Sequence, residues 1–184
     1  RSSNNYFYII FRRVINQEIY PNTFMDSNVG LQKWADYMDR FGLGRPLGID
    51  IPNEKGGKIP GPDYYDRIYG QYRWKWSTIN SVSIGQGEVL TSPLQMANYT
   101  AIIANKGWYI TPHVVKSIGV DGKPRVEYRQ KNYVGIDSVH FDSVIEGMVM
   151  VVNEGTGFRS RLPGIQVCGK TGTSQNPHGE DHSV

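Results

Sequence analysis

Residues 167 to 174 read Val-Cys-Gly-Lys-Thr-Gly-Thr-Ser and place one lysine among small and hydroxyl residues. The preceding residues, 164 to 167, alternate apolar and polar side chains, which predicts a half-buried strand. The glycines on either side of Lys170-Thr171 indicate a close approach by a ligand or another backbone. Lys170 could hold a carboxylate, and Thr171 and Thr173 could donate hydroxyl hydrogens to it. The alternative is a plain turn at a strand end, which a Lys-Thr-Gly run also suits.

A second polar pair stands at the start of the chain, where one residue separates Ser2 from Asn4. At the beginning of a helix, a serine and an asparagine with this spacing can both point into one cleft. Helix capping is the competing interpretation, because both residue types are favoured at the N-cap.

The composition indicates a folded unit and argues against a nucleic-acid-binding protein. The 184 residues are 39% hydrophobic and 12% aromatic, which is enough for a core. Twenty basic residues against 17 acidic ones leave a formal net charge of +3, too small and too scattered to favour nucleic acid. The single cysteine, Cys168, excludes an internal disulfide, and in the predicted strand we expect it to be a buried, unreactive thiol.

No stretch of the sequence reaches the ~18 consecutive apolar residues of a membrane helix, and the first residues lack the pattern of a secretion signal. The chain begins at Arg1 without a methionine and ends at Val184, where a new strand could be starting. We therefore expect a fragment of a longer protein, with any anchor or signal outside it.

Apolar residues at three-and-four spacing predict two helices in the first quarter of the chain. Asn4 or Asn5 would cap the first helix, whose stripe runs from Phe7 to Ile15. The second helix is expected to begin at Ser27 and to end near Gly42.

Two more helices are predicted later in the chain. A hydroxyl cap followed by proline at Ser92-Pro93 starts one of them, and Asn105 and Gly107 stop it. Gly155 is the expected C-cap of the other. The expected buried stripe of this last helix consists of Phe141, Val144, Ile145, Met148, Val149 and Val152.

The remaining segments read as loops and one hairpin. Residues 42 to 80 are rich in Gly, Pro and Tyr and predict a long surface loop. Residues 114–120 and 124–128 flank Asp121-Gly122 and predict a β-hairpin. Helices followed by a hairpin, a helix and a strand predict an α+β fold, a helical cluster packed against an antiparallel sheet. We find no internal repeat and no domain boundary within residues 1–184.

Several other side chains could be functional but also have structural interpretations. His113 follows a proline at a strand start, where a structural role is favoured over a catalytic one. The group His178, Glu180, Asp181 and His182 resembles a metal site in composition only, and a polar hairpin loop is the favoured interpretation. The aromatic residues between Tyr69 and Trp76 either stack on a ligand or partner, or anchor the long loop.

Five ordered matches extend over nearly the whole chain, and together they resemble one family. They are Ser2-Ser3-Asn4-Asn5-Tyr6-Phe7-Tyr8, Ser83-Ile84-Gly85-Gln86-Gly87 with 91–97, then 104–107 with 112–114, then 147–157, and finally Lys170-Thr171-Gly172-Thr173. In this order and spacing the chain resembles the transpeptidase domain of class B penicillin-binding proteins, most closely the elongation-type penicillin-binding protein 2 group. The first and last matches are similar to the second and third active-site motifs of that family.

The resemblance implies a serine-type D,D-transpeptidase of the β-lactamase/transpeptidase fold, without a cofactor or metal. Ser2 would relay a proton, Asn4 would hydrogen-bond the acyl-donor amide, and Lys170 would supply positive potential and help the relay. Thr171, Gly172 and Thr173 would bind the substrate, with the hydroxyls on the terminal carboxylate and the Thr173 N–H on the oxyanion. The family's first motif, Ser-x-x-Lys with its nucleophilic serine, does not occur in these 184 residues. We therefore expect the fragment, spanning the second through the third motif, to be inactive by itself.

The resemblance also implies partners and a location. Peptidoglycan stem peptides would be the substrate and β-lactam antibiotics the inhibitors. The parent protein would be anchored in the cell inner membrane, with its catalytic domain in the periplasm or otherwise extracytoplasmic, and would work with a membrane glycan polymerase. Two alternatives stay open: a β-lactamase or D,D-carboxypeptidase, and a non-catalytic β-lactam sensor or interaction module.

Overall fold

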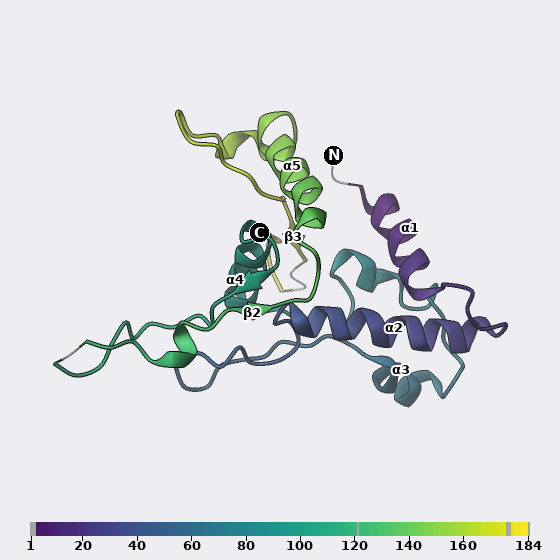
Figure 1. The fold of residues 1–184 in the computed structure, drawn as a ribbon. Helices are drawn as coiled ribbons and strands as arrows, with labels where there is room; N and C mark the ends of the chain where they lie inside the picture. Colours follow the sequence, from purple (N-terminus) through teal and green to yellow (C-terminus); the bar gives the residue numbers. More distant parts are fainter. Residues whose placement is uncertain (1–2, 121, 176–177, 184) are drawn as a thin grey trace.

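Helices dominate the computed structural model, which describes residues 3–120, 122–175 and 178–183, and the strands are short (Figure 1). The helices are α1 (Asn4–Ile15), α2 (Thr23–Arg40), α3 (Pro62–Tyr69), α4 (Pro93–Ala104) and α5 (Val139–Asn153), with single-turn 3-10 helices η1 (Asn80–Ile84), η2 (Val126–Tyr128) and η3 (Phe158–Ser160). The strands are β1 (Trp108–Tyr109), β2 (Asn132–Tyr133), β3 (Thr173–Ser174) and β4 (His182–Ser183).

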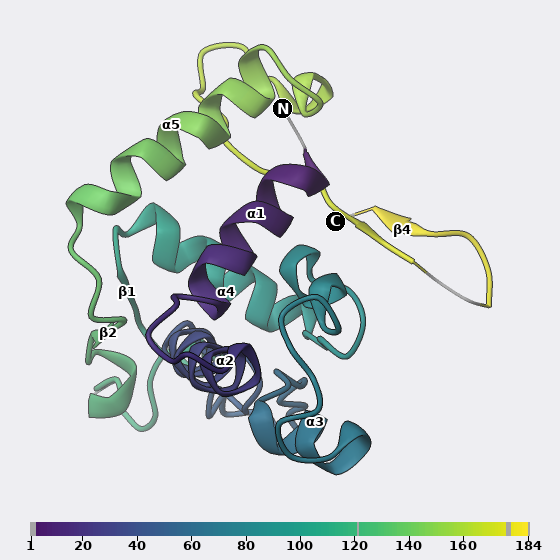
Figure 2. The same cartoon turned by 90° about the vertical axis from the view of Figure 1, so that its right-hand side faces the viewer.

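Two antiparallel ladders contain these strands. Trp108 pairs with Tyr133 and Tyr109 with Asn132 in one ladder, and β3 pairs with β4 in the other. α1 contacts α2 and η1, α3 lies on the other side of α2, and α5 packs on α4 (Figures 1 and 2). The fold is therefore α+β as expected, with helices as its main part. In the part of the chain that is described, no helix is both long and apolar enough to cross a membrane.

The first core lies where α1, α2, α3 and η1 meet. Its buried members are Phe11, Ile15, Leu31, Tyr65, Trp74, Ile79 and Val82. α1 and α2 approach so closely that a Cβ atom on Gly30 would lie 2.1 Å from the Ile15 carbonyl oxygen. Only glycine permits this contact, so the end of α1 is held directly on the backbone of α2.

The second core joins α4, β1 and α5. Ile102, Tyr109, Val134 and Phe141 are its buried members. An ion pair of 2.6 Å between Lys106 Nζ and Asp142 Oδ1 links the same elements at the surface, where its contribution to stability is small.

The N-terminal helices form with different caps from those expected. Ser3, rather than Asn4 or Asn5, caps α1, since its backbone is extended and its hydroxyl accepts the Tyr6 N–H. α2 begins at Thr23, capped by Asn22, and not at Ser27. Ser27 lies fully buried inside α2, where its Oγ accepts the Trp76 N–H at 3.1 Å. The expected end near Gly42 is confirmed.

The expectation of one long surface loop over residues 42 to 80 is wrong. Pro62 occupies the first turn of α3, a position that proline favours, and the segment contributes two buried aromatic side chains to the first core. Trp74 is 1% exposed and donates its ring N–H to Asp66 Oδ1 at 2.6 Å. Trp76 packs against the same core and lies under the Arg12 guanidinium. For Trp74 and Trp76, the anchoring interpretation is therefore confirmed.

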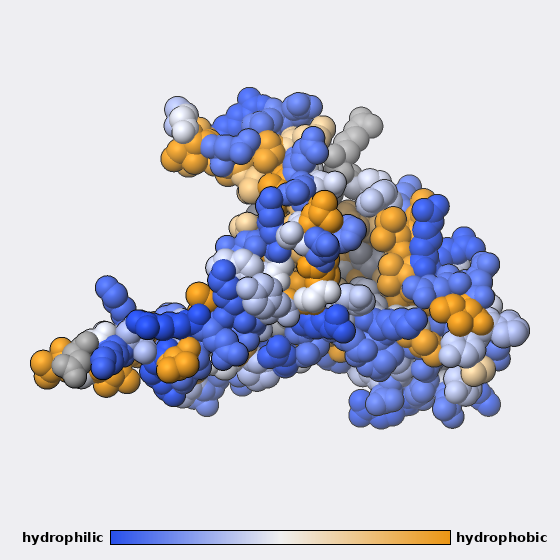
Figure 3. Space-filling view, in the orientation of Figure 1, coloured by the Kyte–Doolittle hydropathy of each residue, from blue (hydrophilic) through white to orange (hydrophobic). Residues whose placement is uncertain are grey.

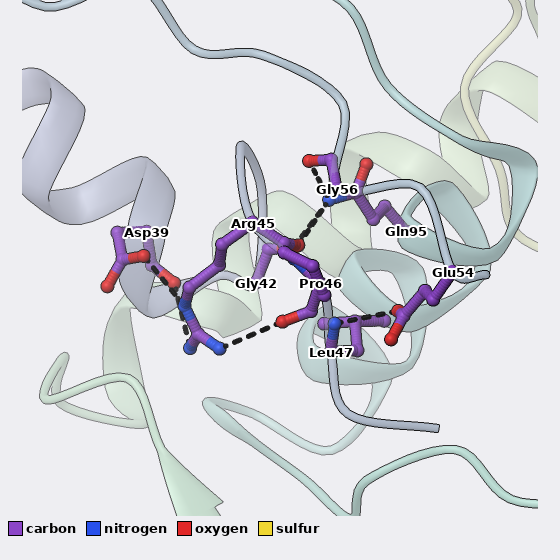
Figure 4. Close-up of polar contacts among 8 residues, drawn as sticks. All are labelled: Asp39, Gly42, Arg45, Pro46, Leu47, Glu54, Gly56 and Gln95. Atoms are coloured by element: carbon purple, nitrogen blue, oxygen red, sulfur yellow. Dashed lines mark hydrogen bonds and ion pairs between the residues drawn. The ribbon is translucent and has the colours of Figure 1, made fainter. Parts of the chain in front are cut away.

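α4 forms as predicted, and its first turn joins three loops. The Ser92 Oγ accepts the Gln95 N–H, and the Gln95 Oε1 accepts the Ser92 N–H, which completes a capping box after the expected proline start. The Gln95 side chain is fully buried, and its Nε2 lies 3.1, 2.9 and 2.8 Å from the carbonyl oxygens of Gly42, Arg45 and Gly56, which share its two hydrogens (Figure 4). Gln95 therefore satisfies loop backbone that no sheet or helix pairs.

The hairpin predicted over residues 114–128 is confirmed only as a reversal of the chain, and its two predicted strands do not form. Val114 and Val115 donate their N–H groups to the Asp50 carboxylate at 2.9 and 2.7 Å, so a side chain takes the place of a partner strand. A single bridge joins Ile118 to Lys123, and Asp121 lies outside the described residues. The two hydrogen bonds from Val114 and Val115 lower the pKa of Asp50 below its ordinary value. The segment forms an arm that extends away from the helices (Figure 1).

α5 and the segment after it also depart from expectation. Phe141 and Val152 are buried, but Val144 is exposed, so the predicted stripe is only partly covered. Glu154 is the C-cap, and Gly155 instead lies close to Val151, where a Cβ would come within 2.9 Å of the carbonyl oxygen.

The predicted strand over 164–167 is wrong, because that stretch holds only a bridge between Leu162 and Ile165. Ile165 is 64% exposed, and Cys168 is exposed instead of buried.

Exposed apolar side chains lie on α1, on α5 and along the arm (Figure 3). They include Tyr6, Ile9, Val144, Met150, Ile118, Val120 and Val126. His113 lies on the arm, where its ring stacks on Tyr128 with 4.3 Å between centroids, in keeping with the expected structural role.

We predict that Gln95→Leu lowers the free energy of unfolding by about 3 kcal/mol, because it leaves buried carbonyls without a donor. Urea denaturation of the chain measures this. The control is Gln32→Ala on the exposed side of α2, where the amide donates to Asp36 and the loss should stay below about 0.5 kcal/mol. Equal losses in both variants would contradict the role assigned to Gln95.

We also predict that Trp74→Ala lowers the free energy of unfolding by about 3 to 5 kcal/mol, because it empties the centre of the first core. Tyr72→Ala removes an aromatic side chain from the same segment that is 42% exposed, and it should cost less than about 1 kcal/mol. Thermal melting of both variants distinguishes an anchor from a ligand-stacking surface. An unchanged melting temperature for Trp74→Ala would refute the anchoring interpretation.

Candidate functional site

A cleft of about 490 Å³ lies where α1, η1 and residues 169–173, here called the Lys170 segment, meet. Its lining residues are Asn4, Phe7, Ser83, Ile84, Gln86, Lys170, Thr171, Gly172 and Thr173. Among these lining residues Lys170 carries the single charge. The cleft therefore combines positive potential with hydroxyl and amide groups, which suits an anionic peptide-like ligand.

α1 supplies one wall of the cleft through a continuous stripe. Asn4, Phe7, Phe11 and Ile15 are spaced three or four residues apart and share one helix face. Phe11 and Ile15 are buried in the first core, so the same face carries Phe7 and Asn4 into the cleft. Because Ser3 makes the capping bond, the Asn4 carboxamide is not needed for it.

η1 and the glycine turn after it form the floor. Gly85 and Gly87 both adopt positive φ, at 73° and 69°, and a Cβ on Gly87 would lie 2.6 Å from the Ser81 Oγ. This tight turn presents Gln86 to the cleft. The Ser83 hydroxyl donates to the Asn80 carbonyl at 2.6 Å, which commits its hydrogen to the backbone.

The floor is supported from behind by the first core. Val82 of η1 is buried there, and the Tyr65 hydroxyl donates to Glu88 Oε2 at 2.8 Å. Burial and this carboxylate raise the pKa of Tyr65 well above its ordinary value, so the phenol stays protonated and remains a donor. The position of the Ser83 to Gln86 floor is thus determined by α3 and its aromatic neighbours.

The Lys170 segment forms the third side, and α5 supports it. The Gly169 N–H donates to the Met148 carbonyl at 3.2 Å, and the Thr171 Oγ1 lies 2.8 Å from the Thr156 Oγ1 in the turn after α5. The Lys170 Nζ donates to the Thr171 carbonyl at 2.6 Å. β3 then begins at Thr173, where the hairpin with β4 holds the end of the segment.

The structure brings most of the expected site residues together. Asn4 lies across one cleft from Lys170, Thr171, Gly172 and Thr173, although about 165 residues separate the two groups in the chain. Ser2 lies outside the described residues.

Four further lining residues, Phe7, Ser83, Ile84 and Gln86, were not predicted as site residues. A polar residue between two glycines, in Gly85-Gln86-Gly87, was the signal that could have indicated the floor.

The remaining candidates lie elsewhere. In the described ranges, no group of three or more His, Cys, Asp or Glu side chains is arranged to hold a metal ion. His178, Glu180 and Asp181 lie between β3 and β4, which confirms the polar hairpin loop for these three residues, whereas His182 belongs to strand β4.

The sequence and the geometry agree with one known family. Residues 1–183 match the family described as the penicillin binding protein transpeptidase domain. The chain belongs to this family. The expected family resemblance is thereby confirmed.

Individual relatives agree with the penicillin-binding transpeptidase assignment. The chain is 36% identical over 154 residues to the peptidoglycan D,D-transpeptidase MrdA of Acinetobacter baumannii, covering 81% of this chain and 22% of that protein. It is similar to the crystal structure of Pseudomonas aeruginosa PBP2 in complex with WCK 5153, with a TM-score of 0.73 and 28% identity over 98% of this chain and 37% of that one.

A third similarity is to a peptidoglycan synthase complex described as coordinating polymerization and crosslinking. The TM-score is 0.71 with 28% identity, over 95% of this chain and 26% of that one. These matches confirm the β-lactamase/transpeptidase fold and the similarity to the penicillin-binding protein 2 group. The chain spans 22% of the length of the MrdA relative.

Proposed function

We propose that this chain forms three sides of the active site of a peptidoglycan D,D-transpeptidase, and that a Ser-x-x-Lys segment outside the 184 residues supplies the nucleophile. The observation that supports this most strongly is the meeting of Asn4 with Lys170, Thr171 and Thr173 across one cleft. Membership of the penicillin-binding transpeptidase family supports the same reaction class.

In the proposed reaction, the serine Oγ attacks the carbonyl carbon between the two terminal D-alanines of a stem peptide. The bond to the nitrogen of the terminal D-alanine breaks, and D-alanine leaves after its nitrogen takes up the proton that the serine hydroxyl gave up. The amine of a neighbouring stem then attacks the acyl-enzyme, which forms the cross-link and frees the serine. A β-lactam enters the same cleft and acylates the serine in the same way.

The residues of this chain bind and polarise the substrate. The cationic Lys170 and the hydroxyls of Thr171 and Thr173 attract the terminal carboxylate. The Thr173 N–H faces the developing oxyanion, where one well-placed donor contributes about 3 kcal/mol. Asn4 hydrogen-bonds the acyl-donor amide from the opposite wall, and Ser2 relays the proton. Gln86 offers a further amide from the floor of the cleft.

The wider setting is part of the same proposal. The substrate is the peptidoglycan stem peptide. The parent protein is anchored in the cell inner membrane, and its catalytic domain lies in the periplasm or is otherwise extracytoplasmic. The similarity to a synthase complex of polymerization and crosslinking supports a glycan polymerase as its partner.

Two alternatives make different predictions about the second half of the reaction. A β-lactamase or D,D-carboxypeptidase uses water to resolve the acyl-enzyme, so it hydrolyses β-lactams or releases D-alanine without joining stems. A β-lactam sensor keeps the acyl group on its serine, so it turns over neither β-lactams nor stem peptides. Incubation of the full-length protein with stem peptides and an acceptor amine, and separately with a β-lactam, each followed by mass spectrometry, separates the three.

We predict that Lys170→Ala in the full-length protein slows acylation by a fluorescent penicillin by about 100-fold or more, because the charge that holds the carboxylate is lost. Lys131→Ala is the matched control. This lysine lies over the Trp108 ring outside the cleft, with 3.9 Å between Nζ and the ring centroid, and its removal should leave the rate within about twofold.

The purified 184-residue chain should not be labelled at all, since it has no Ser-x-x-Lys motif. A labelled 184-residue chain would contradict the proposed origin of the nucleophile.

A further inference from the structure

Thr156 lies in the turn after α5 and is not a lining residue of the cleft, yet its hydroxyl contacts one that is. The Oγ1 atoms of Thr156 and Thr171 are 2.8 Å apart, a normal length for an O–H···O hydrogen bond. Thr171 lines the cleft beside Lys170. The Thr156 side chain thus links the turn after α5 directly to the Lys170 segment.

The turn that carries Thr156 is itself well fixed. The Gly157 N–H donates to the Val151 carbonyl at 2.9 Å, and the Arg161 Nε donates to the Val152 carbonyl at 3.1 Å. Gly155 lies against Val151, where a larger residue would have to displace the backbone. These contacts therefore hold the backbone of the turn that carries Thr156 in place.

The backbone also links α5 to the same wall. The bond from the Gly169 N–H to the Met148 carbonyl places the start of the Lys170 segment against α5. This bond fixes the position of the main chain, but it leaves the rotation of the Thr171 hydroxyl open. The contact with Thr156 restricts that rotation.

The direction of the hydrogen bond matters for an anionic ligand. A threonine hydroxyl has one hydrogen and two lone pairs. If Thr156 donates, Thr171 accepts with a lone pair and keeps its own hydrogen for a carboxylate oxygen. Donation from Thr156 also polarises the Thr171 hydroxyl and makes it a better donor.

We propose that Thr156 is a positioning residue, which donates to Thr171 and so orients the Thr171 hydroxyl toward the carboxylate of the bound substrate or β-lactam. This inference rests on the proposed transpeptidase function. It assigns Thr156 no contact with the ligand. Its effect must therefore depend on whether the ligand carries a carboxylate.

The test compares acylation of the full-length protein by a penicillin with a free carboxylate and by the methyl ester of the same penicillin. In Thr156→Val, which keeps the shape and removes the hydroxyl, the rate constant for the free acid should fall about tenfold. The rate constant for the ester should change less than about threefold, because a neutral ester oxygen accepts the oriented hydrogen bond only about half as strongly as a carboxylate does. Thr156→Ser, which keeps the hydroxyl, should restore the wild-type preference for the free acid.

Thr100→Val is the matched control. The Thr100 Oγ1 also makes an exposed hydrogen bond of 2.8 Å, to the Met96 carbonyl on α4 away from the cleft. It should change neither rate constant. A double-mutant cycle with Thr171→Val adds a second readout: the two substitutions should be strongly non-additive, because each removes the same hydrogen bond.

The outcomes are distinguishable. Equal losses for acid and ester in Thr156→Val, no loss for either, or additive effects in the cycle would overturn the positioning role while leaving the transpeptidase proposal intact. A wild-type full-length protein that neither penicillin acylates would overturn the transpeptidase proposal, and the role of Thr156 with it.

Discussion

The buried carboxamide of Gln95 is the interaction on which the arrangement of this chain most depends. Its Nε2 serves carbonyl groups from three separate loop positions, Gly42, Arg45 and Gly56, while its Oε1 completes the cap of α4. A buried carbonyl without a donor is costly, and a long segment without regular structure has many such groups. Gln95 thus pairs carbonyl groups between residues 42 and 56 that no helix or sheet pairs.

The loops that Gln95 holds lead directly into the elements that position the cleft. Lys58 pairs with Leu90 just beyond them, which brings the start of the α3 segment to the end of the glycine turn after η1. Between these two points lie α3 and Trp74, and both pack against Val82 behind the floor. Gln95 on α4 and the aromatic side chains of Tyr65 and Trp74 therefore both help to hold the Ser83 to Gln86 floor in place.

The sequence correctly predicted those helix starts that depend on hydrogen bonds between residues close together in the chain. The Ser92-Pro93 start of α4 is one example, because both cap partners lie within four residues. Ser27 shows the opposite case: it looks like a cap, but its hydroxyl bonds the backbone of Trp76, 49 residues away. Likewise the alternation over 164–167 suits a strand, yet the described residues provide no neighbouring strand beside it.

The site divides in the same way. Asn4 and the Lys170 to Thr173 run are short motifs whose chemistry can be recognised from residue types alone. The floor could not be recognised, because its place in the cleft depends on tertiary packing behind Val82. Thr156 could not be recognised either, since its partner is 15 residues away and joins it only through the fold.

The Ser3 cap has a consequence for the phase of α1. If α1 began one residue later, Asn4 would be the N-cap with non-helical backbone angles, and its side chain would leave the helix face that it shares with Phe7. The other end of α1 offers no freedom to compensate, because the Ile15 carbonyl is seated on Gly30. Gly30 on α2, which contacts the C-terminal end of α1, therefore helps to set the direction of the Asn4 side chain at the mouth of the cleft.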